Sequence, residues 1–349
     1  MTNERILWVD YLKALAIIGV IGIHCSSILL DDKYLFTLPW YESVVAASFF
    51  RFAIILFVMA SGYLLLRKCQ PVSSIPRRLK RILIPFVFWF IVYSIVKVVL
   101  KDVIGTSWTV LDLLLYIMDG FLNPLLVSVQ FWYVYMILGL YLLSPVLSKW
   151  IQNAGMDEIE YFLLIWVIIS ILQFVGIESV LFDYLRYFTG SIGYFVLGYY
   201  LTVKDNELLN NNRFALLLLV VGLLFTVCGT IFMSHMNLSQ SLFFIRLGDL
   251  TPGACLEAVG LFILVKNIDY SKFKPKINDI VIKISKDSYG VYLVNILVIN
   301  LLEKLHFVHL ERFTFLMIIL TMLVVFVISE LIVEILYRIP YTRRFSGRG

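Results

Sequence analysis

The sequence predicts an all-α fold, a polytopic bundle of about ten membrane-spanning helices with both termini in the cytoplasm. Hydrophobic residues make up 61% of the chain and the mean hydropathy is +0.91, whereas soluble domains are about 45–50% apolar. The apolar residues form continuous runs and do not alternate with polar ones, which favours helices over the strands of a membrane barrel. Composition therefore excludes a soluble globular protein.

Ten apolar segments are long enough to be candidate spans. To within a few residues they cover 11–30, 43–66, 82–100, 130–148, 159–177, 185–203, 214–233, 252–267, 288–303 and 313–336. A further segment, 110–122, is too short to cross a bilayer, which indicates an interfacial or re-entrant helix. No repeat or linker divides the chain, so we expect a single integral membrane domain over residues 1–349 without an attached soluble domain.

Positive charge predicts which side of the membrane each connection faces. With ten spans, three segments rich in Lys and Arg share one side: the second-to-third connection, the eighth-to-ninth connection and the tail after the last span. The opposite connections are poorer in these residues and hold Lys33, Lys101, Arg246, Lys304 and Arg312. The positive-inside rule then places both termini in the cytoplasm of a multi-pass protein of the plasma or inner membrane. The net charge of +5 belongs to these loops and does not indicate a nucleic-acid partner.

The first span carries ionisable residues along one face. Lys13 and His24 are eleven residues apart, and Asp10 lies one turn before Lys13. At about 100° per residue, Lys13 and His24 share nearly one face, with about 16 Å of rise between them. Taken singly, Lys13 suits a residue that anchors the helix end and Asp10 its helix-spacing partner. His24 indicates a functional site, because an ionisable residue inside a span is costly and imidazole serves as base, acid or nucleophile.

Four arginines follow in the second span and at the start of the third. Arg51 lies inside the second span, where it needs a carboxylate, a carbonyl or an anionic ligand. An anchoring role at the outer interface fits it equally well. Arg77, Arg78 and Arg81 lie at the cytoplasmic mouth of the third span and set topology. Arg78 and Arg81, at i,i+3, can also close on one anion, which predicts a site for a phosphate-rich donor.

Other polar and aromatic residues lie within or beside the apolar segments. Trp132 is at the outer start of the fourth span, a place where aromatic residues usually mark the interface. Tyr292 lies in the ninth span, and Glu257 is a buried carboxylate in the eighth with no obvious partner. Glu330 and Glu334, near the inner end of the last span, are expected to pair with Arg338 or with other cytoplasmic bases. The four cysteines have no paired spacing, so neither a disulfide framework nor a metal site is predicted.

Six motifs occur in order along nearly the whole chain. They are WVDYLKALAIIGVIGIH with Lys13 and His24, Arg51 ahead of LFVMASGYLL, RRLKRILIPF with Arg78 and Arg81, FWYVYMILGLYLLSP, YFVLGYYL, and SYGVYL. In this order they resemble the integral membrane acyltransferases of the acyltransferase-3 type, which modify surface polysaccharides and lipids. Family members often have His at the position of Asn295, so the resemblance does not carry a catalytic role to Tyr292 and Asn295.

The resemblance implies an acyl-CoA-dependent acyltransferase with no permanently bound cofactor. The donor is acyl-CoA, usually acetyl-CoA, from the cytoplasm, and the acceptor is a hydroxyl of a cell-surface or lipid-linked glycan. The roles it implies are donor binding by Arg77, Arg78 and Arg81, catalysis by His24, Lys13 and Arg51, and support by Asp10, Trp132 and Tyr292. His24 would act as base or carry the acyl group briefly.

Two other functions fit a polytopic protein with polar residues inside its spans. A transporter or flippase of a lipid-linked sugar is one, but no repeated halves or paired broken helices favour it. A non-catalytic relative is the other, and the intact Lys13, His24, Arg51 and Arg81 oppose it. An assay of acyl transfer from a CoA thioester by the purified protein distinguishes the acyltransferase from the transporter and from the non-catalytic relative. Acceptor identity, acyl-chain length and oligomeric state do not follow from the sequence.

Overall fold

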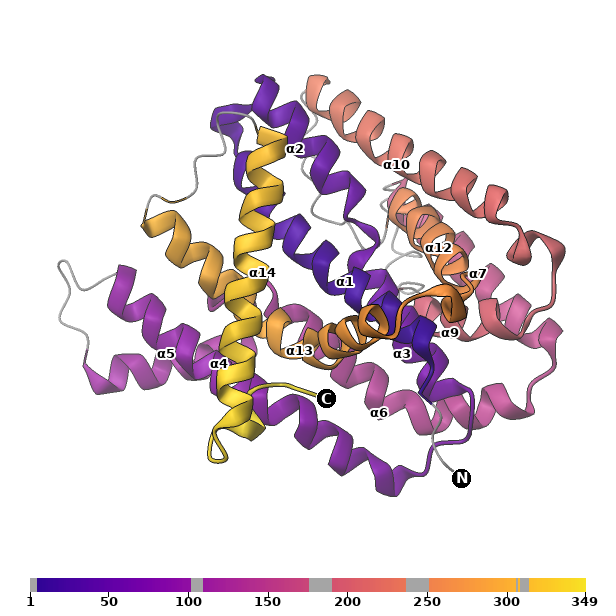
Figure 1. The fold of residues 1–349 in the computed structure, drawn as a ribbon, viewed down its shortest axis with the longest axis horizontal. Helices are drawn as coiled ribbons and strands as arrows, with labels where there is room; N and C mark the ends of the chain where they lie inside the picture. The colour runs from indigo at the N-terminus through magenta and orange to yellow at the C-terminus, as the bar shows by residue number, and fades with distance from the viewer. Residues whose placement is uncertain (1–4, 102–108, 176–189, 237–250, 306, 308–313) are drawn as a thin grey trace. The chain divides into compact units, whose positions relative to one another are not determined.

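The computed structural model describes residues 5–101, 109–175, 190–236, 251–305, 307 and 314–349, and all regular elements within these ranges are helical (Figure 1). The α-helices are α1 (Leu7–Ser26), α2 (Leu38–Phe49), α3 (Phe52–Leu66), α4 (Ile75–Lys101), α5 (Val110–Leu122), α6 (Phe131–Asn153), α7 (Met156–Phe174), α9 (Ser191–Val203), α10 (Asn212–His235), α12 (Pro252–Lys266), α13 (Pro275–Lys304) and α14 (Thr314–Arg338). Short 3₁₀ turns join several of them: η1 (Ser27–Leu29), η2 (Asp32–Tyr34), η3 (Val72–Ser74), η4 (Pro124–Leu126), η6 (Glu207–Asn210), η7 (Tyr270–Lys272) and η8 (Arg343–Phe345). The prediction of an all-α protein is confirmed.

Within the described ranges, six helical stretches are long and apolar enough to cross a membrane. They are Leu7–Leu29, Leu38–Leu66, Val72–Lys97, Phe131–Asn153, Asn212–His235 and Thr314–Arg338. Each coincides with a span expected from the sequence, and together they indicate a multi-pass membrane protein. The other four expected spans fall on α7, α9, α12 and α13. Helix α9 has 13 residues and α12 has 15, while α13 carries charged residues along its first half.

The count of ten spans and the cytoplasmic position of both termini therefore stay predictions. Part of that prediction lies outside the described residues: 176–177 and 185–189 of two expected spans, and the loop residues Arg246 and Arg312. The segment 110–122 does form a short helix, α5. Its start is a capping box in which Thr109 and Asp112 bond to each other's backbone, the arrangement that satisfies the first free N–H groups of a helix.

The contacts within the chain define two compact units. Unit 1 comprises Met1–Gln70, Ser144–Lys286 and Val308–Leu323, and unit 2 comprises Pro71–Leu143, Asp287–Phe307 and Val324–Gly349. The chain passes between them several times, so neither unit is a continuous segment. The expectation of a single integral membrane domain stays a prediction.

Close helix crossings hold unit 1 together. Helix α3 packs against α9 and α1, and α10 packs against α12. At the α3–α9 crossing, a Cβ on Gly62 would overlap the Phe195 carbonyl, and one on Gly198 would overlap the Met59 carbonyl. Small residues allow helix backbones to approach this closely, which matters in lipid because no hydrophobic force drives the helices together.

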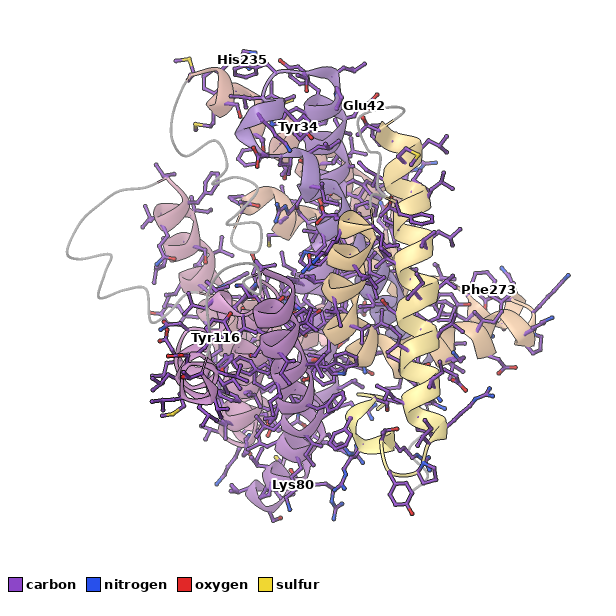
Figure 2. All side chains as sticks on the ribbon, turned by 90° about the vertical axis from the view of Figure 1, so that its left-hand side faces the viewer. Tyr34, Glu42, Lys80, Tyr116, His235 and Phe273 are labelled. Carbon is purple, nitrogen blue, oxygen red and sulfur yellow. The ribbon has the colours of Figure 1, made fainter. Side chains whose placement is uncertain are left out.

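Helices α2 and α10 meet at one end of unit 1, where Figure 2 shows Tyr34, Glu42 and His235. The Tyr41 hydroxyl donates to Nε2 of His235 at 3.3 Å. The other ring nitrogen, Nδ1, donates to the Ile231 carbonyl at 2.9 Å. In the neutral ring these two partners fix the tautomer, with the proton on Nδ1. His235 therefore has a structural role in joining the two helices.

In unit 2 the residues after α14 fold back onto α4. The ring of Phe345 stacks on Phe88, with centroids 4.7 Å apart and planes at 15°. The Phe345 carbonyl accepts a hydrogen bond of 3.2 Å from Trp89 Nε1. Aromatic pairs of this kind add about 0.5–1.5 kcal/mol to the free energy of burial.

A buried ion cluster fixes the same segment. Arg348 donates from Nε and Nη2 to the two carboxylate oxygens of Asp287, and from Nη2 to Glu334 Oε2 at 2.5 Å. Asp287 is fully buried, and its hydrogen bond raises the pKa of the Arg348 guanidinium above the usual value. The expected pair of Glu334 and Arg338 is also present, at 2.7 Å. Sequence reasoning missed the Arg348–Asp287 pair.

We predict that Arg348→Ala destabilises the protein by about 3 kcal/mol, because it leaves the Asp287 carboxylate buried and unpaired. Arg338→Ala is the matched control, since it removes a pair to the same Glu334 but its side chain is 77% exposed, against 13% for Arg348. Ion pairs at the exposed surface contribute about 0–1 kcal/mol to the free energy of unfolding. Thermal unfolding of the detergent-solubilised variants checks this, and equal midpoints for the two would contradict it.

Candidate active site

Asp10 lies in the first turn of α1 and is 6% exposed. Its carboxylate accepts two hydrogen bonds from Arg5, at 2.7 and 2.8 Å, and one of 2.6 Å from the Ser285 hydroxyl. An acidic group there is also favoured by the positive end of the helix dipole. The sequence paired Asp10 with Lys13. In the structure its hydrogen-bond partners are Arg5 and Ser285, and it joins the start of α1 to α13.

Lys13 and His24 are both partly exposed. The charges of Asp10 and Arg5 act on Lys13 at the first end of the helix. His24 lies in the last turn of α1, where the negative end of the dipole favours a cation by about 0.3–1 kcal/mol.

Arg51 lies at a break between two helices. Helix α2 ends at Phe49, α3 begins at Phe52, and Arg51 is the N-cap residue of α3. Its side chain is only 7% exposed, which does not fit an anchoring role at the membrane surface, since such a role requires contact with water. The break interrupts the regular helix inside the apolar stretch Leu38–Leu66, as is typical of functional backbone at membrane depth.

The positive charge of Arg51 lies within electrostatic reach of His24 and also of Glu257. The end of α1 and helix α12 therefore each lie within electrostatic reach of the α2–α3 break. Unit 1 thus holds the expected catalytic residues His24, Lys13 and Arg51, with Asp10 beneath them on α1. Of these, Arg51 lies within electrostatic reach of His24, and Asp10 within electrostatic reach of Lys13.

The expected donor-binding residues lie in the first two turns of α4, in unit 2. Arg77 and Arg81 are exposed and Arg78 is partly buried. Helix α4 begins at Ile75, so the positive end of its dipole adds to the charge of the arginines. This end of α4 can bind a phosphate group, which is an anion that guanidinium binds with paired hydrogen bonds.

The expected supporting residues of unit 2 are held by their own helices. Tyr292 is 3% exposed, and its hydroxyl donates to the Gln130 carbonyl. Its ring lies 5.1 Å from that of Tyr133. Trp132 is partly exposed beside Tyr133. The Asn295 amide donates back to carbonyls of its own helix, at 2.6 and 3.2 Å, so this Asn stabilises α13.

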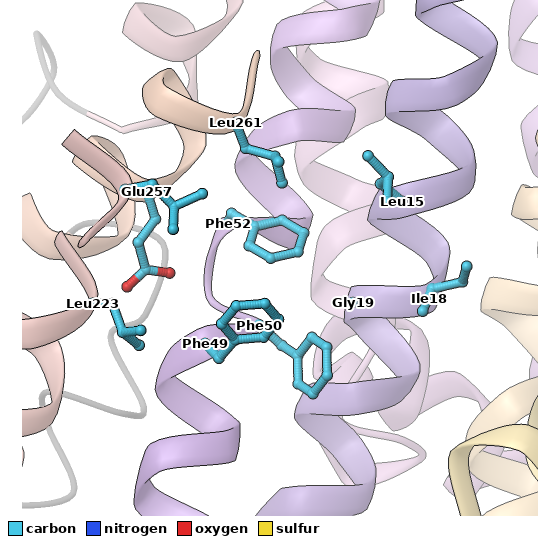
Figure 3. A pocket seen from close by; sticks show the side chains of 10 residues that line it. Leu15, Ile18, Gly19, Phe49, Phe50, Phe52, Leu223, Glu257 and Leu261 are labelled. Carbon is cyan, nitrogen blue, oxygen red and sulfur yellow. The ribbon is translucent and has the colours of Figure 1, made fainter. Parts of the chain in front are cut away.

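Glu257, which had no obvious partner in the sequence, is 1% exposed on α12. Its Oε1 accepts a weak hydrogen bond of 3.4 Å from Thr226 of α10. It lines an apolar cavity on α1, α10 and α12 (Figure 3), and His24 is not among the lining residues. Within the described ranges, no group of three or more His, Cys, Asp or Glu residues could hold a metal ion.

Sequence reasoning missed Arg5 and Ser285 as partners of Asp10. Arg5 had a local signal, because it precedes Asp10 by five residues at the start of the first span. Ser285 had none, since it lies 275 residues away in the chain. Only the packing of α13 against the start of α1 brings it there.

Long apolar helices with a histidine and a buried arginine inside them define a multi-pass membrane protein with a polar site. The model of a family described as an acyltransferase domain, the acyltransferase-3 family, matches residues 6–333. The match covers nearly the whole chain and both units, so the chain belongs to this family of membrane acyltransferases. The resemblance noted from the six motifs is confirmed. No match was found among curated proteins or solved structures.

We predict that Ser285→Ala lowers the free energy of unfolding by about 1.5–3 kcal/mol, because it removes a hydrogen bond to a buried carboxylate. Ser271→Ala is the matched control. Ser271 makes the same 2.6 Å bond to Asp269, but that aspartate is 55% exposed, so the expected change is within about 0.5 kcal/mol. Thermal unfolding in detergent measures the change in stability of both variants. An equal decrease in the two would show that the hydrogen bond to Asp10 contributes no more to stability than the exposed bond to Asp269.

Proposed function

We propose that the protein transfers an acyl group, in the simplest case acetyl, from cytosolic acyl-CoA to a hydroxyl of a cell-surface or lipid-linked glycan. The observation that carries this proposal is the pairing of His24 with the charge of Arg51 inside the apolar helices of a member of the acyltransferase-3 family. A base and a cation held together are the two groups that acyl transfer to a hydroxyl requires.

The donor is bound through its phosphates. Arg77, Arg78 and Arg81 lie within two turns at the start of α4, and each can form charge-assisted hydrogen bonds with phosphate oxygens. Two of the three side chains are exposed, so a ligand reaches them without a change in the fold. Lys13 is a further positive charge, on the face of α1 that also carries His24, and we assign it to the catalytic group with His24.

The reaction at His24 has two steps, addition of the acceptor to the thioester and then loss of CoA. The imidazole takes the proton of the acceptor hydroxyl while the hydroxyl oxygen forms a bond to the thioester carbonyl carbon. The negative charge that develops on the carbonyl oxygen is stabilised by Arg51, an interaction worth about 3–4 kcal/mol where a single donor has been removed from such sites. The carbon–sulfur bond then breaks, and CoA leaves as the thiol with the proton from His24.

A second route uses the same residues. His24 attacks the thioester itself, carries the acyl group as an acyl-imidazole, and then passes it to the acceptor. Both routes require the same enzyme groups and give the same products. A burst of CoA release without acceptor, equal to the amount of enzyme, is expected for the second route alone.

The acceptor side follows from the orientation of the chain. With the termini inside, the end of α1 that carries His24 faces the outer half of the membrane, while the start of α4 faces the cytoplasm. A glycan on the outer surface, or one linked to a lipid in the membrane, is then the acceptor. The bilayer of the plasma or inner membrane is the site of action.

Replacement of His24 by Ala is expected to lower acyl transfer from acetyl-CoA by at least about a hundredfold, because the general base is lost. His235→Ala removes the other histidine in the described ranges of unit 1, one with the structural partners Tyr41 and Ile231, and it is expected to keep its activity. Mass spectrometry of the acceptor glycan measures transfer. An active His24→Ala protein would overturn the assignment.

Replacement of Arg78 and Arg81 together by Ala is expected to raise the KM for acetyl-CoA about tenfold or more, with kcat little changed, because phosphate contacts bind ground state and transition state alike. Arg213→Ala removes one exposed arginine at the start of α10 and should leave KM unchanged. If kcat falls while KM stays constant, the two arginines do not bind the donor's phosphates.

A further inference from the structure

Helix α13 is the longest helix in the described ranges, with 30 residues, and its two halves differ in composition. The first half, PKINDIVIKISK, holds three lysines and one aspartate, whereas the second half contains the expected span 288–303. At 1.5 Å per residue α13 is about 45 Å long, while the hydrocarbon core of a bilayer is about 30 Å thick. The charged first half is therefore left to the membrane surface.

One face of this first half is attached to the start of α1, within unit 1. The Tyr11 hydroxyl donates to Asn278 Oδ1 at 2.8 Å, and the Ser285 hydroxyl donates to Asp10 at 2.6 Å. Asn278 and Ser285 are seven residues apart, so they lie on the same side of α13. The two hydrogen bonds thereby fix the rotation of the helix about its own axis.

A second face carries exposed isoleucines. Ile277 is 46% exposed and Ile280 is 52% exposed, and Ile284, one turn further on, is partly exposed. Their spacing places the three on one line along the helix, here called the α13 stripe, about 120° around the axis from the face bonded to α1. Phe273, just ahead of the helix and labelled in Figure 2, is also 36% exposed.

The third face carries positive charge. Lys276 and Lys283 are both exposed, and they lie about 80° from the α13 stripe, on the side away from α1. Exposed Lys272 and Lys274 precede them, so residues 272–286 hold five lysines against one aspartate. An apolar stripe beside a lysine-rich face is typical of helices that lie on anionic membranes. The lysine stems can cover apolar surface while the ammonium groups reach the headgroups.

We propose that the first three turns of α13 lie in the membrane interface and bind anionic phospholipids, with the α13 stripe against the acyl chains and Lys276 and Lys283 at the headgroup phosphates. The stripe favours a lipid over a soluble anion, which has no apolar part to cover it. The lysines favour an anionic headgroup over a zwitterionic one, by about fivefold in affinity for each lysine near the surface. None of the residues assigned to donor binding or catalysis belongs to this surface.

The test uses the full-length protein in phosphatidylcholine nanodiscs that contain one of two photoactivatable phospholipids. Both carry a diazirine near the top of an acyl chain, and the headgroup is either phosphatidylglycerol or phosphatidylcholine. After irradiation, mass spectrometry locates the label. Residues 272–286 are expected to reach half-maximal labelling at an at least about fivefold lower mole fraction of the phosphatidylglycerol probe. Equal labelling by the two probes, or labelling only elsewhere, would overturn the lipid assignment.

Lysine variants with a matched control sharpen the comparison. Lys276→Gln combined with Lys283→Gln should remove most of the preference for phosphatidylglycerol, and a preference that survives would count against these lysines as the headgroup site. Lys68→Gln combined with Lys149→Gln removes the same charge from two exposed lysines elsewhere in unit 1. This control should label as the wild type does. The ratio of the two probes is measured within each protein, so it does not depend on the amount of protein recovered.

Two further measurements separate a lipid from other partners. Ile280→Gln should lower labelling by both probes, since it removes apolar contact, and unchanged labelling would show that the α13 stripe does not face lipid. Free CoA in excess should leave the phosphatidylglycerol label on residues 272–286 unchanged, because CoA offers phosphates without an acyl chain for the stripe. Loss of the label on addition of CoA would show that the lysines bind a soluble phosphate.

Discussion

The charge of Arg51 within electrostatic reach of His24, inside long apolar helices, is the constraint on which the proposed chemistry depends. A central arginine costs about 2.5–3.5 kcal/mol on membrane-insertion scales, and unit 1 accommodates it at a break in a long apolar stretch. The break keeps Arg51 7% exposed and within reach of two helices, α1 and α12. Packing of α1 against α3 then brings the imidazole to the same place. A cation held there fits the proposed role of stabilising negative charge in a transition state.

Much of this was predictable from the sequence, for identifiable physical reasons. Continuous apolar runs predict helices in lipid, and within the described residues six of the ten predicted spans coincide with long apolar helices. The placement of Lys13 and His24 on one face followed from helix geometry alone. The pair of Glu334 and Arg338 followed from i,i+4 spacing. In each case the partners lie on one helix, so local periodicity contains the information.

What the sequence could not predict depends on contacts between distant segments. Ser285 bonds to Asp10 across 275 residues, and Arg348 reaches Asp287 only because the tail folds back onto α4. The break at Arg51 gives no clear signal either, since FFRFAIIL contains no Pro or Gly and reads as continuous helix. The apolar cavity is lined by four segments, and from the sequence Glu257 was only a carboxylate without a partner. Span count and orientation rest on charge patterns and stay predictions.

The most direct test of the account is single-turnover transfer of a labelled acetyl group from CoA by the purified protein in proteoliposomes, with Arg51 replaced by Gln. The account predicts a rate at least about a hundredfold below that of the wild type, because a preorganised stabiliser of the oxyanion is lost. The affinity for acetyl-CoA should stay the same, since the donor's phosphates are bound by other arginines. An unchanged transfer rate in a folded Arg51→Gln protein would contradict the account.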